Sequence, residues 1–424
     1  MLLACPTTAG TLAAVRTLGR AGVPVVVGGE RRLSAARLSR FTRAYWTFQG
    51  TGSEAHFLAG LRSFATQASK HVLLPASDDT VWLFAKHAEE LGRHYTVYVP
   101  RLDVVDALLD KQQLGEACNA VGLSTLPSWF PESFADVARL APQLDYPVLI
   151  KPRRHLFRTR REKGVVVGAA RDLERAFEAF VRRERSGDEG LTRQPMPMIQ
   201  AFVETAVENV VSVTGFIDRS GTRAIMGANR KVLQRSRPAG VGLAFESIAL
   251  PEGLGESTQR LCRHSGAFGI FEIEFVWHDG AWRVIDFNPR FYQEMRLDIA
   301  RGIPLPLLAY LDACGNLDEL DRVLAKARGE HRPDLGFTDM FTTTLMTTLR
   351  AIANFPAARA AIAWHWRRRG RLVDATFDLF DPLPFFAHAL CELRLGLEQF
   401  PRLVGEARLP RAGDEARLPR EQLE

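Results

Sequence analysis

Cysteine is scarce in this sequence, and long apolar runs are missing. Five cysteines are spread over 424 residues, and no two form a C-x-x-C pair of the kind used for zinc or redox chemistry. No window holds about 18 uninterrupted apolar residues, so no membrane-spanning helix is predicted. The opening Met1-Leu2-Leu3-Ala4-Cys5 resembles a lipoprotein cleavage box but lacks the basic and apolar regions that secretion requires. We therefore predict a strand there and a reduced, cytoplasmic location.

A strong excess of charge of either sign is also absent. Lys and Arg number 55 against 49 for Asp and Glu, which gives a formal net charge of +6. This excess suits a polyphosphate or another anionic ligand, whereas a nucleic-acid-binding arm concentrates more charge in one stretch. Hydrophobic residues make up 46% and charged residues 25%, close to the average for soluble globular chains. We therefore expect most of the chain to fold and do not expect a nucleic-acid partner.

The first 105 residues predict a small doubly wound α/β domain, although the dinucleotide-binding pattern G-x-G-x-x-G is missing after its first strand. Apolar runs alternate there with helical spacing, in the order 2–5 (strand), 10–21 (helix), 23–27 (strand), 71–75 (strand), 80–91 (helix) and 95–99 (strand).

The rest of the chain divides into further units. A helix over 104–121, strands at 148–151 and 165–167 and a helix over 172–185 form the second unit. A third begins at 198 and is rich in strands. After Pro306 the pattern is largely helical, and two near-copies of Glu-Ala-Arg-Leu-Pro-Arg lie in a charged tail for which disorder is predicted.

The segment 272–290 carries the most informative motif. An Asp-Gly step at 279–280 predicts a β-hairpin, in which alternate residues share one face. The polar residues that share this face are Glu272, Glu274, Asp286, Asn288 and Arg290. Carboxylates facing one another are unfavourable unless a cation lies between them, and Mg²⁺ uses such oxygen ligands together with water and nucleotide phosphates. The alternative is a solvent-facing amphipathic hairpin.

With these residues the sequence resembles the ATP-grasp superfamily, ligases whose two lobes clamp ATP and join a carboxylate to an amine, thiol or similar nucleophile through an acyl phosphate. The resemblance implies that Glu274 and Asp286, which are 286 − 274 = 12 residues apart as in biotin carboxylase, bind Mg²⁺. It also implies that Asn288 is a metal ligand and that Arg290 lies near the reacting group. Asp286 stands where Glu is commoner, and its shorter reach predicts that one ion is held through water.

Lysines upstream add to the resemblance. Lys111 after Asp110 is similar to the lysine that contacts the ATP phosphates, and Lys151 in Val-Leu-Ile-Lys-Pro is similar to the second ATP-binding lysine. An ammonium group is a compact charge suited to phosphate oxygens. Each lysine alone would be typical of a protein surface, so it is their order and spacing that carry the resemblance.

The run 199–204 resembles the hinge between the two lobes of the family. The resemblance implies that the side chain of Gln200 and the backbone of Phe202 and Val203 contact adenine. It places Glu208 at the ribose hydroxyls. A carboxylate suits this position because it can accept hydrogen bonds from hydroxyl groups.

Two basic loops leave alternatives open. The family covers the phosphates with a glycine-rich flap, but the run 153–163 is rich in arginine here, and only Lys163-Gly164 resembles the end of that flap. Its arginines could contact phosphates, bind an anionic acceptor substrate or lie in solvent. By position, Lys231 and Arg235 resemble the family loop that approaches the γ-phosphate and the carboxylate substrate. The alternative is a basic turn. The following Glu246-Ser247 resembles the carbamoyl-phosphate-synthetase-like and D-aspartate-ligase-like branch.

The resemblance implies an α/β and α+β chain of four parts. These are a pre-ATP-grasp domain (1–105), an ATP-grasp domain (106–312, with a small lobe to about 197 and a large lobe from about 198), a mainly helical extension (313–404) and a disordered tail (405–424). In the extension, Trp364, Trp366 and a run of arginines indicate a membrane interface, a nucleic-acid contact or a helix that packs its Trp inward.

Together these features predict an ATP-dependent carboxylate–amine (or thiol) ligase that releases ADP and phosphate, with ATP and Mg²⁺ as cofactors and Mn²⁺ as an alternative ion. Arg290, Lys231 and Arg235 are the predicted catalytic residues. A phosphotransferase on the same scaffold is the enzyme alternative, and a basic nucleic-acid-binding protein is the alternative outside enzymes. The identity of the small-molecule carboxylate and amine depends on variable loops, and a homo-oligomer is compatible with the sequence.

Overall fold

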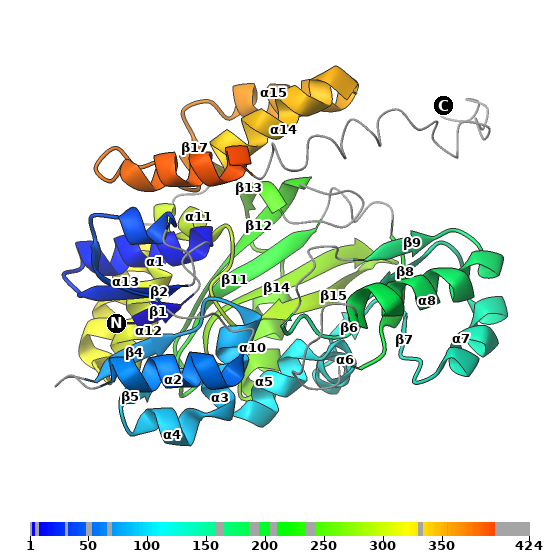
Figure 1. The fold of residues 1–424 in the computed structure, drawn as a ribbon, viewed down its shortest axis with the longest axis horizontal. Helices are drawn as coiled ribbons and strands as arrows, with labels where there is room; N and C mark the ends of the chain where they lie inside the picture. The colour runs from blue at the N-terminus through cyan, green and yellow to red at the C-terminus, as the bar shows by residue number, and fades with distance from the viewer. Residues whose placement is uncertain are drawn as a thin grey trace.

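The structure, a computed structural model, describes residues 2–4, 8–29, 33–47, 53–65, 70–157, 164–185, 195–203, 210–234, 242–329, 334–353 and 355–394. Within these ranges the chain forms three β-sheets, and helices cover them (Figure 1). None of the helices in the same ranges is both long enough and apolar enough to cross a membrane.

The N-terminal sheet is parallel, with the strand order β3-β2-β1-β4-β5. Its strands are β1 (Leu2–Ala4), β2 (Val25–Gly29), β3 (Thr42–Thr47), β4 (His71–Leu74) and β5 (Tyr95–Val97), and its helices are α1 (Ala9–Arg20), α2 (Glu54–Phe64), α3 (Asp78–Lys86) and α4 (Ala88–Gly92). Sequence reasoning missed β3 because all six of its residues are partly or largely exposed, so it shows no apolar run.

Two helices, α5 (Leu102–Leu109) and α6 (Lys111–Ala120), link this sheet to the rest of the chain. The single helix predicted over 104–121 is wrong, because Asp110 has extended backbone angles and caps α6. Its carboxylate accepts hydrogen bonds from the backbone N–H groups of Gln112 and Gln113. The break places Lys111 at the very start of α6.

The second sheet is antiparallel, in the order β7-β10-β8-β9. It comprises β7 (Ser128–Trp129), β8 (Val148–Lys151), β9 (Val165–Val167) and β10 (Met198–Ala201). Helices α7 (Phe134–Leu140) and α8 (Ala170–Arg185) cover one face, where Phe177 and Phe180 of α8 pack against Val148 and Ile150 of β8. In Figure 1 this unit lies at the right of the molecule.

The third sheet is the largest, with eight strands in the order β17-β16-β13-β12-β11-β14-β15-β6. These are β6 (Ser124–Thr125), β11 (Val211–Ile217), β12 (Ala224–Gln234), β13 (Gly242–Ile248), β14 (Gly269–His278), β15 (Ala281–Asn288), β16 (Gly336–Thr338) and β17 (Leu372–Asp374). On one face, Leu261 of α10 (Leu254–Ser265) and Leu114 of α6 pack against Ile273 and Phe275 of β14. Alternate residues of β14 therefore point to the other face, where the acidic side chains lie.

Further helices follow the large sheet: α11 (Met295–Ala300), α12 (Leu305–Ala313), α13 (Leu317–Gly329), α14 (Met340–Ala353) and α15 (Phe355–Arg367). Apolar residues of α11 and α12 share a core with α1, which joins the N-terminal sheet to the large sheet. Near the end of α15, Trp364 is buried and Trp366 is exposed. Arg368 pairs with Glu246 of β13 at 2.7 Å, so Glu246 anchors this region to the large sheet.

Candidate functional site

Strands β14 and β15 form the hairpin that the sequence predicts. Asp279 and Gly280 both have positive φ (48° and 69°), as the tight two-residue turn of a hairpin requires. In the ladder, Glu274 pairs with Asp286 and Glu272 pairs with Asn288. The predicted opposition of polar side chains across the two strands is therefore confirmed.

Two lysines from other elements neutralise the opposed acids. Lys231 of β12 donates to Oε1 of Glu274 at 2.6 Å, and Lys111 donates to Oδ1 of Asp286 at 3.0 Å. Burial disfavours the charged form of Lys231, but the carboxylate of Glu274 outweighs burial and raises the pKa of the lysine. Lys111, one of the two predicted ATP-binding lysines, and Lys231, a predicted catalytic residue, thus lie directly against the two predicted metal-binding acids.

Arg290 links the hairpin to the N-terminal sheet. Its Nε donates to Oδ1 of Asp78 at 2.7 Å, and its Nη2 donates to Oδ1 of Asn288 at 2.8 Å. Asp78 is the first residue of α3, and acids are favourable at a helix N-terminus. Sequence reasoning missed Asp78, because the contact joins residues more than 200 positions apart.

A second pair of carboxyl groups lies behind the first. Glu272 is buried, accepts from Ser212 at 2.9 Å and from Asn288 at 3.2 Å, and faces Glu294, which is also buried. Burial and then mutual repulsion raise the pKa of Glu294 well above its usual range, and burial together with Glu274 raises the pKa of Glu272. Oε1 of Glu294 has no hydrogen-bond partner among the described residues. Glu294 was missed because it follows the hairpin and belongs to no periodic pattern.

These groups converge on one cavity of about 360 Å³, which we call the acidic pocket. Its wall combines the hairpin, β12, the start of α3 and the segment 291–294. The polar residues that line it are Thr8, Ser77, Asp78, Asp79, His155, Lys231, Glu272, Glu274, Asp286, Asn288, Arg290, Gln293 and Glu294. Apolar walls surround this concentration of charge, with Phe245, Phe291 and Tyr292 among the lining residues.

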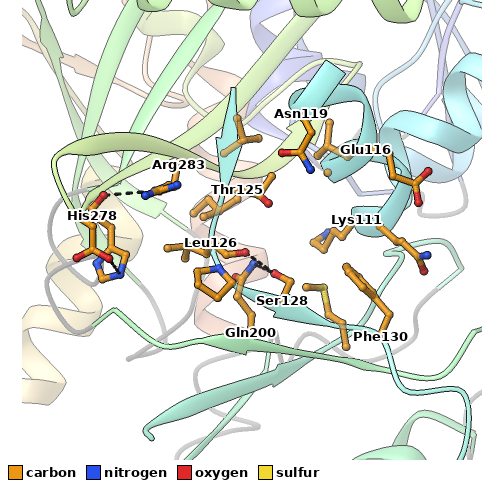
Figure 2. Close-up of a pocket in the computed structure, with 18 residues that line it drawn as sticks. Lys111, Glu116, Asn119, Thr125, Leu126, Ser128, Phe130, Gln200, His278 and Arg283 are labelled. Carbon is orange, nitrogen blue, oxygen red and sulfur yellow. Dashed lines mark hydrogen bonds and ion pairs between the residues drawn. The ribbon is translucent and has the colours of Figure 1, made fainter. Parts of the chain in front are cut away.

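A second cavity, of about 420 Å³, lies between α6, β6, β10 and β15, and we call it the hinge pocket (Figure 2). Figure 2 shows Lys111 and Gln200 among its lining residues, with the hydrogen bond from Gln200 Nε2 to Ser128 Oγ at 3.0 Å. Apolar contacts come from Leu126, Phe130 and other lining residues. Lys111 lines the hinge pocket while its ammonium group binds Asp286 in the acidic pocket, so the two cavities meet at this ion pair.

The predicted hinge residues lie at the end of β10. The backbone N–H of Phe202 donates to the carbonyl of Pro147 at 3.2 Å, so this N–H serves to join β10 to the start of β8. Val203 is partly exposed beside it. Lys151, at the end of β8, donates to the carbonyl of Ile285 at 3.4 Å, and Ile285 lines the hinge pocket.

The described start of the basic loop lies against an acid. Arg153 and Arg154 each donate to the carboxylate of Asp110 at 2.8 Å, and Arg154 also donates to Asp106 at 3.1 Å. Although burial raises the pKa of Asp110, the two arginines lower it further than burial raises it. These two guanidinium groups therefore support the start of α6, where Lys111 lies.

Other predicted site residues fall outside the described ranges. They are Lys163, Glu208 and Arg235. In the ranges that are described, no three His, Cys, Asp or Glu side chains form a metal-binding group. The candidate ligands are instead the carboxylates of Glu274 and Asp286 with the amide of Asn288. This smaller set fits Mg²⁺ bound with phosphates, which uses one or two carboxylates rather than a protein cage.

Comparison with known proteins places this geometry in context. No protein-family model matches the chain. Over 240 residues, 54% of the chain, it is 21% identical to the carbamoyl phosphate synthase large chain of Mycobacterium bovis, and the match covers 19% of that protein. The chain thus spans about a fifth of the length of the curated relatives it matches.

Solved structures match over a larger share of the chain. The biotin carboxylase domain of Hydrogenobacter thermophilus 2-oxoglutarate carboxylase, a complex with MgADP, ADP and bicarbonate, has a TM-score of 0.57 at 17% identity, covering 74% of this chain and 69% of that one. The L-amino acid ligase of Bacillus licheniformis has a TM-score of 0.57 at 14% identity, covering 79% and 78%. Both are ATP-grasp ligases, and the predicted mixture of α/β and α+β structure is confirmed in its coarse form, as a mixed α/β chain with a large sheet. The resemblance inferred from the motifs holds at the level of the fold: this chain has the ATP-grasp fold.

Proposed function

We propose that this protein is an ATP-dependent ligase that joins a carboxylate to an amine, or a thiol, through an acyl phosphate and releases ADP and phosphate. One observation carries the proposal. Glu274 and Asp286 oppose each other across the hairpin, and each is neutralised by a lysine at the edge of the acidic pocket. Lysines placed against metal-binding acids can turn to phosphate oxygens when a cation replaces them at the carboxylates.

The donor set fits Mg²⁺, or Mn²⁺ in its place. Glu274, Asp286 and Asn288 would hold the ion, and the remaining positions are left for water and phosphate oxygens. When bound, the ion neutralises the charge that develops on the transferred phosphoryl group. With their carboxylates engaged by the ion, Lys111 and Lys231 are free to bind the phosphate chain.

The hinge pocket is the proposed site of the nucleoside, since it joins the acidic pocket at Lys111. Gln200 would bind the adenine edge, and the backbone of Phe202 and Val203 completes this contact in our proposal. Lys151, which ends β8 and pairs with Met198 at the start of β10, would contact the phosphates. By resemblance to the family, Lys163 closes over the phosphates and Glu208 accepts from the ribose hydroxyls.

The acidic pocket is the proposed place of reaction. An oxygen of the substrate carboxylate attacks the γ-phosphorus, and the bond to the β–γ bridging oxygen breaks as ADP leaves. Arg290, Lys231 and, by resemblance, Arg235 stabilise the added negative charge. The amine then attacks the acyl carbon and phosphate departs. Glu294 lines this pocket, and in its ionised form it would accept the proton of the amine.

The remaining assignments extend the same proposal. Residues 1–105, 106–312, 313–404 and 405–424 would be the pre-ATP-grasp domain, the two-lobed ATP-grasp domain, the C-terminal extension and the tail. The substrates would be small molecules, and the cysteine usage favours a cytoplasmic location. The biotin carboxylase domain from Hydrogenobacter thermophilus is a dimer in its crystal structure, and a homo-oligomer is compatible with our proposal.

Hydroxylamine trapping tests the proposal. The protein is incubated with Mg-ATP, hydroxylamine and a library of small carboxylates, and hydroxamate and ADP are measured. A carboxylate that yields both in equal amounts is the expected result, and Glu274→Gln and Asp286→Asn should abolish both products. Glu252→Gln, an exposed acid on another element, is the matched control. AMP formation would contradict the proposal, and a phosphorylated product stable to hydroxylamine would identify a phosphotransferase.

A further inference from the structure

The C-terminal region exposes an unusual number of large apolar side chains. Seven such residues between positions 377 and 393 are 44–74% exposed, and we call them the apolar strip. They are Phe377, Leu379, Phe380, Leu383, Phe386, Leu390 and Leu393. Single exposed apolar residues are ordinary, but a contiguous group of this size indicates an interaction site.

The strip follows one face of a helix. Residues 383–394 are helical, and Leu383, Phe386, Leu390 and Leu393 recur at intervals of three and four. Such spacing places all four side chains on one side. Leu379 and Phe380 precede the helix directly and extend the strip beyond its start.

The opposite face of this helix is firmly attached to the protein. His388 bonds to Asp339 at 2.7 Å, and the ring of Phe385 packs edge-on against that of Phe341 at 6.3 Å between centroids. Ahead of the helix, Asp381 forms a buried ion pair with Arg16 of α1 at 2.9 Å. One face of the helix therefore already packs against the protein, and the apolar strip lies on its other, outward face.

Positive charge surrounds the strip. Arg20 pairs with Asp378 at 2.6 Å and is about half exposed, and the exposed Arg40 contacts the carbonyl of Phe380. Arg394 is exposed at the end of the described helix. The carboxylates of Asp378 and Asp381 are 9% and 2% exposed in ion pairs with arginines, whereas Glu392 on the helix is half-buried.

We propose that the apolar strip docks the protein on an anionic membrane surface. Leucine and phenylalanine side chains beside arginines suit the boundary between acyl chains and anionic headgroups. Twelve helical residues at 1.5 Å each extend only about 18 Å, so the helix would lie in the interface plane and not cross the bilayer. This inference does not depend on the proposed ligase activity.

The rim charge decides between a membrane and a second copy of the chain. Two copies that met through the strip would bring Arg20, Arg40 and Arg394 of each copy near the same residues of the other, and such like-charge contacts are unfavourable. An anionic lipid surface is complementary to both the apolar face and the arginines. Binding should therefore require anionic lipid and weaken with salt.

Vesicle flotation with the full chain tests the proposal. The chain should float with vesicles of phosphatidylcholine and phosphatidylglycerol, and not with vesicles of phosphatidylcholine alone. The double variant Phe386→Ser/Leu390→Ser should reduce the bound fraction at least about tenfold, because two apolar side chains no longer enter the interface. The matched control Leu250→Ser/Leu317→Ser removes two exposed leucines on other elements and should bind like the wild type.

Thermal melting confirms that both variants are folded before they are compared, and light scattering gives the oligomeric state. Flotation that is absent, or that the strip variant does not change, would overturn the proposal. So would a wild-type dimer that the strip variant converts to a monomer without any effect of vesicles, because a second copy would then be the occupant.

Discussion

The buried pair of Lys231 and Glu274 allows a quantitative test of the site. The side chains are 6% and 13% exposed, and the ammonium nitrogen lies 2.6 Å from the carboxylate. Removing one partner takes the ionic attraction of this pair from the remaining buried charge, which costs about 3–5 kcal/mol. Lys231→Met should therefore destabilise the ligand-free protein by about that amount, and Glu274→Gln should do the same. If the two carboxylates had no lysine partners, they would repel each other, and Glu274→Gln would then stabilise the ligand-free protein slightly.

The double variant Lys231→Met/Glu274→Gln distinguishes a coupled ion pair from two independent effects on stability. It leaves neither charge buried, so its cost should fall at least about 2 kcal/mol below the sum of the two single costs. Hydrogen exchange of peptides from β12 and β14 measures the local free energy of opening, which avoids treating the whole chain as one two-state unit.

An exposed ion pair provides the control for this cycle. Arg62 and Glu90 are 56% and 36% exposed, so Arg62→Met should leave the local free energy of opening nearly unchanged. Additive effects of the two site substitutions, or single variants as stable as the wild type, would refute a paired buried charge at this position.

Other contacts support three more predictions. Lys111→Met should lower carboxylate-dependent ADP formation at least about 100-fold, measured under saturating Mg-ATP, because Lys111 is the charge that joins the two pockets at Asp286. Burial lowers the pKa of His388, but the carboxylate of Asp339 raises it by more. The stability from this pair is therefore present below about pH 6.5 and is lost as pH rises through the higher folded pKa. Melting curves of the wild type and His388→Gln should converge toward high pH. Asp381→Asn should leave Arg16 buried and unpaired, and faster hydrogen exchange in α1 and in residues 377–394 would show it.

The hairpin could be predicted because its signals are local. The Asp-Gly turn sets the pairing of His278 with Ala281 and of Phe275 with Val284, and an irregularity between Glu274 and Phe275, which the turn does not predict, then places Glu274 opposite Asp286. The ATP-grasp fold was recognisable for a related reason, since the lysines and acids occur in the family's order along the chain.

Contacts between distant segments could not be predicted in this way. Asp78 reaches Arg290 from helix α3, and Glu294 lies in an irregular segment beside Glu272. The break at Asp110 was missed because a capping carboxylate competes locally with an otherwise continuous apolar helical pattern. Composition alone also could not show that Arg153 donates a hydrogen bond to Asp110, because the two residues are distant in the sequence.

Transfer of oxygen from the carboxylate to phosphate tests the central claim most directly. A carboxylate that is active in the trapping assay is labelled with ¹⁸O and turned over with Mg-ATP and its amine, and the released phosphate is analysed by mass spectrometry. If the γ-phosphoryl group passes to the carboxylate, each phosphate carries one ¹⁸O from the substrate, and the nucleotide product is ADP. Unlabelled phosphate, or labelled AMP, would contradict an acyl-phosphate ligase built on Glu274 and Asp286.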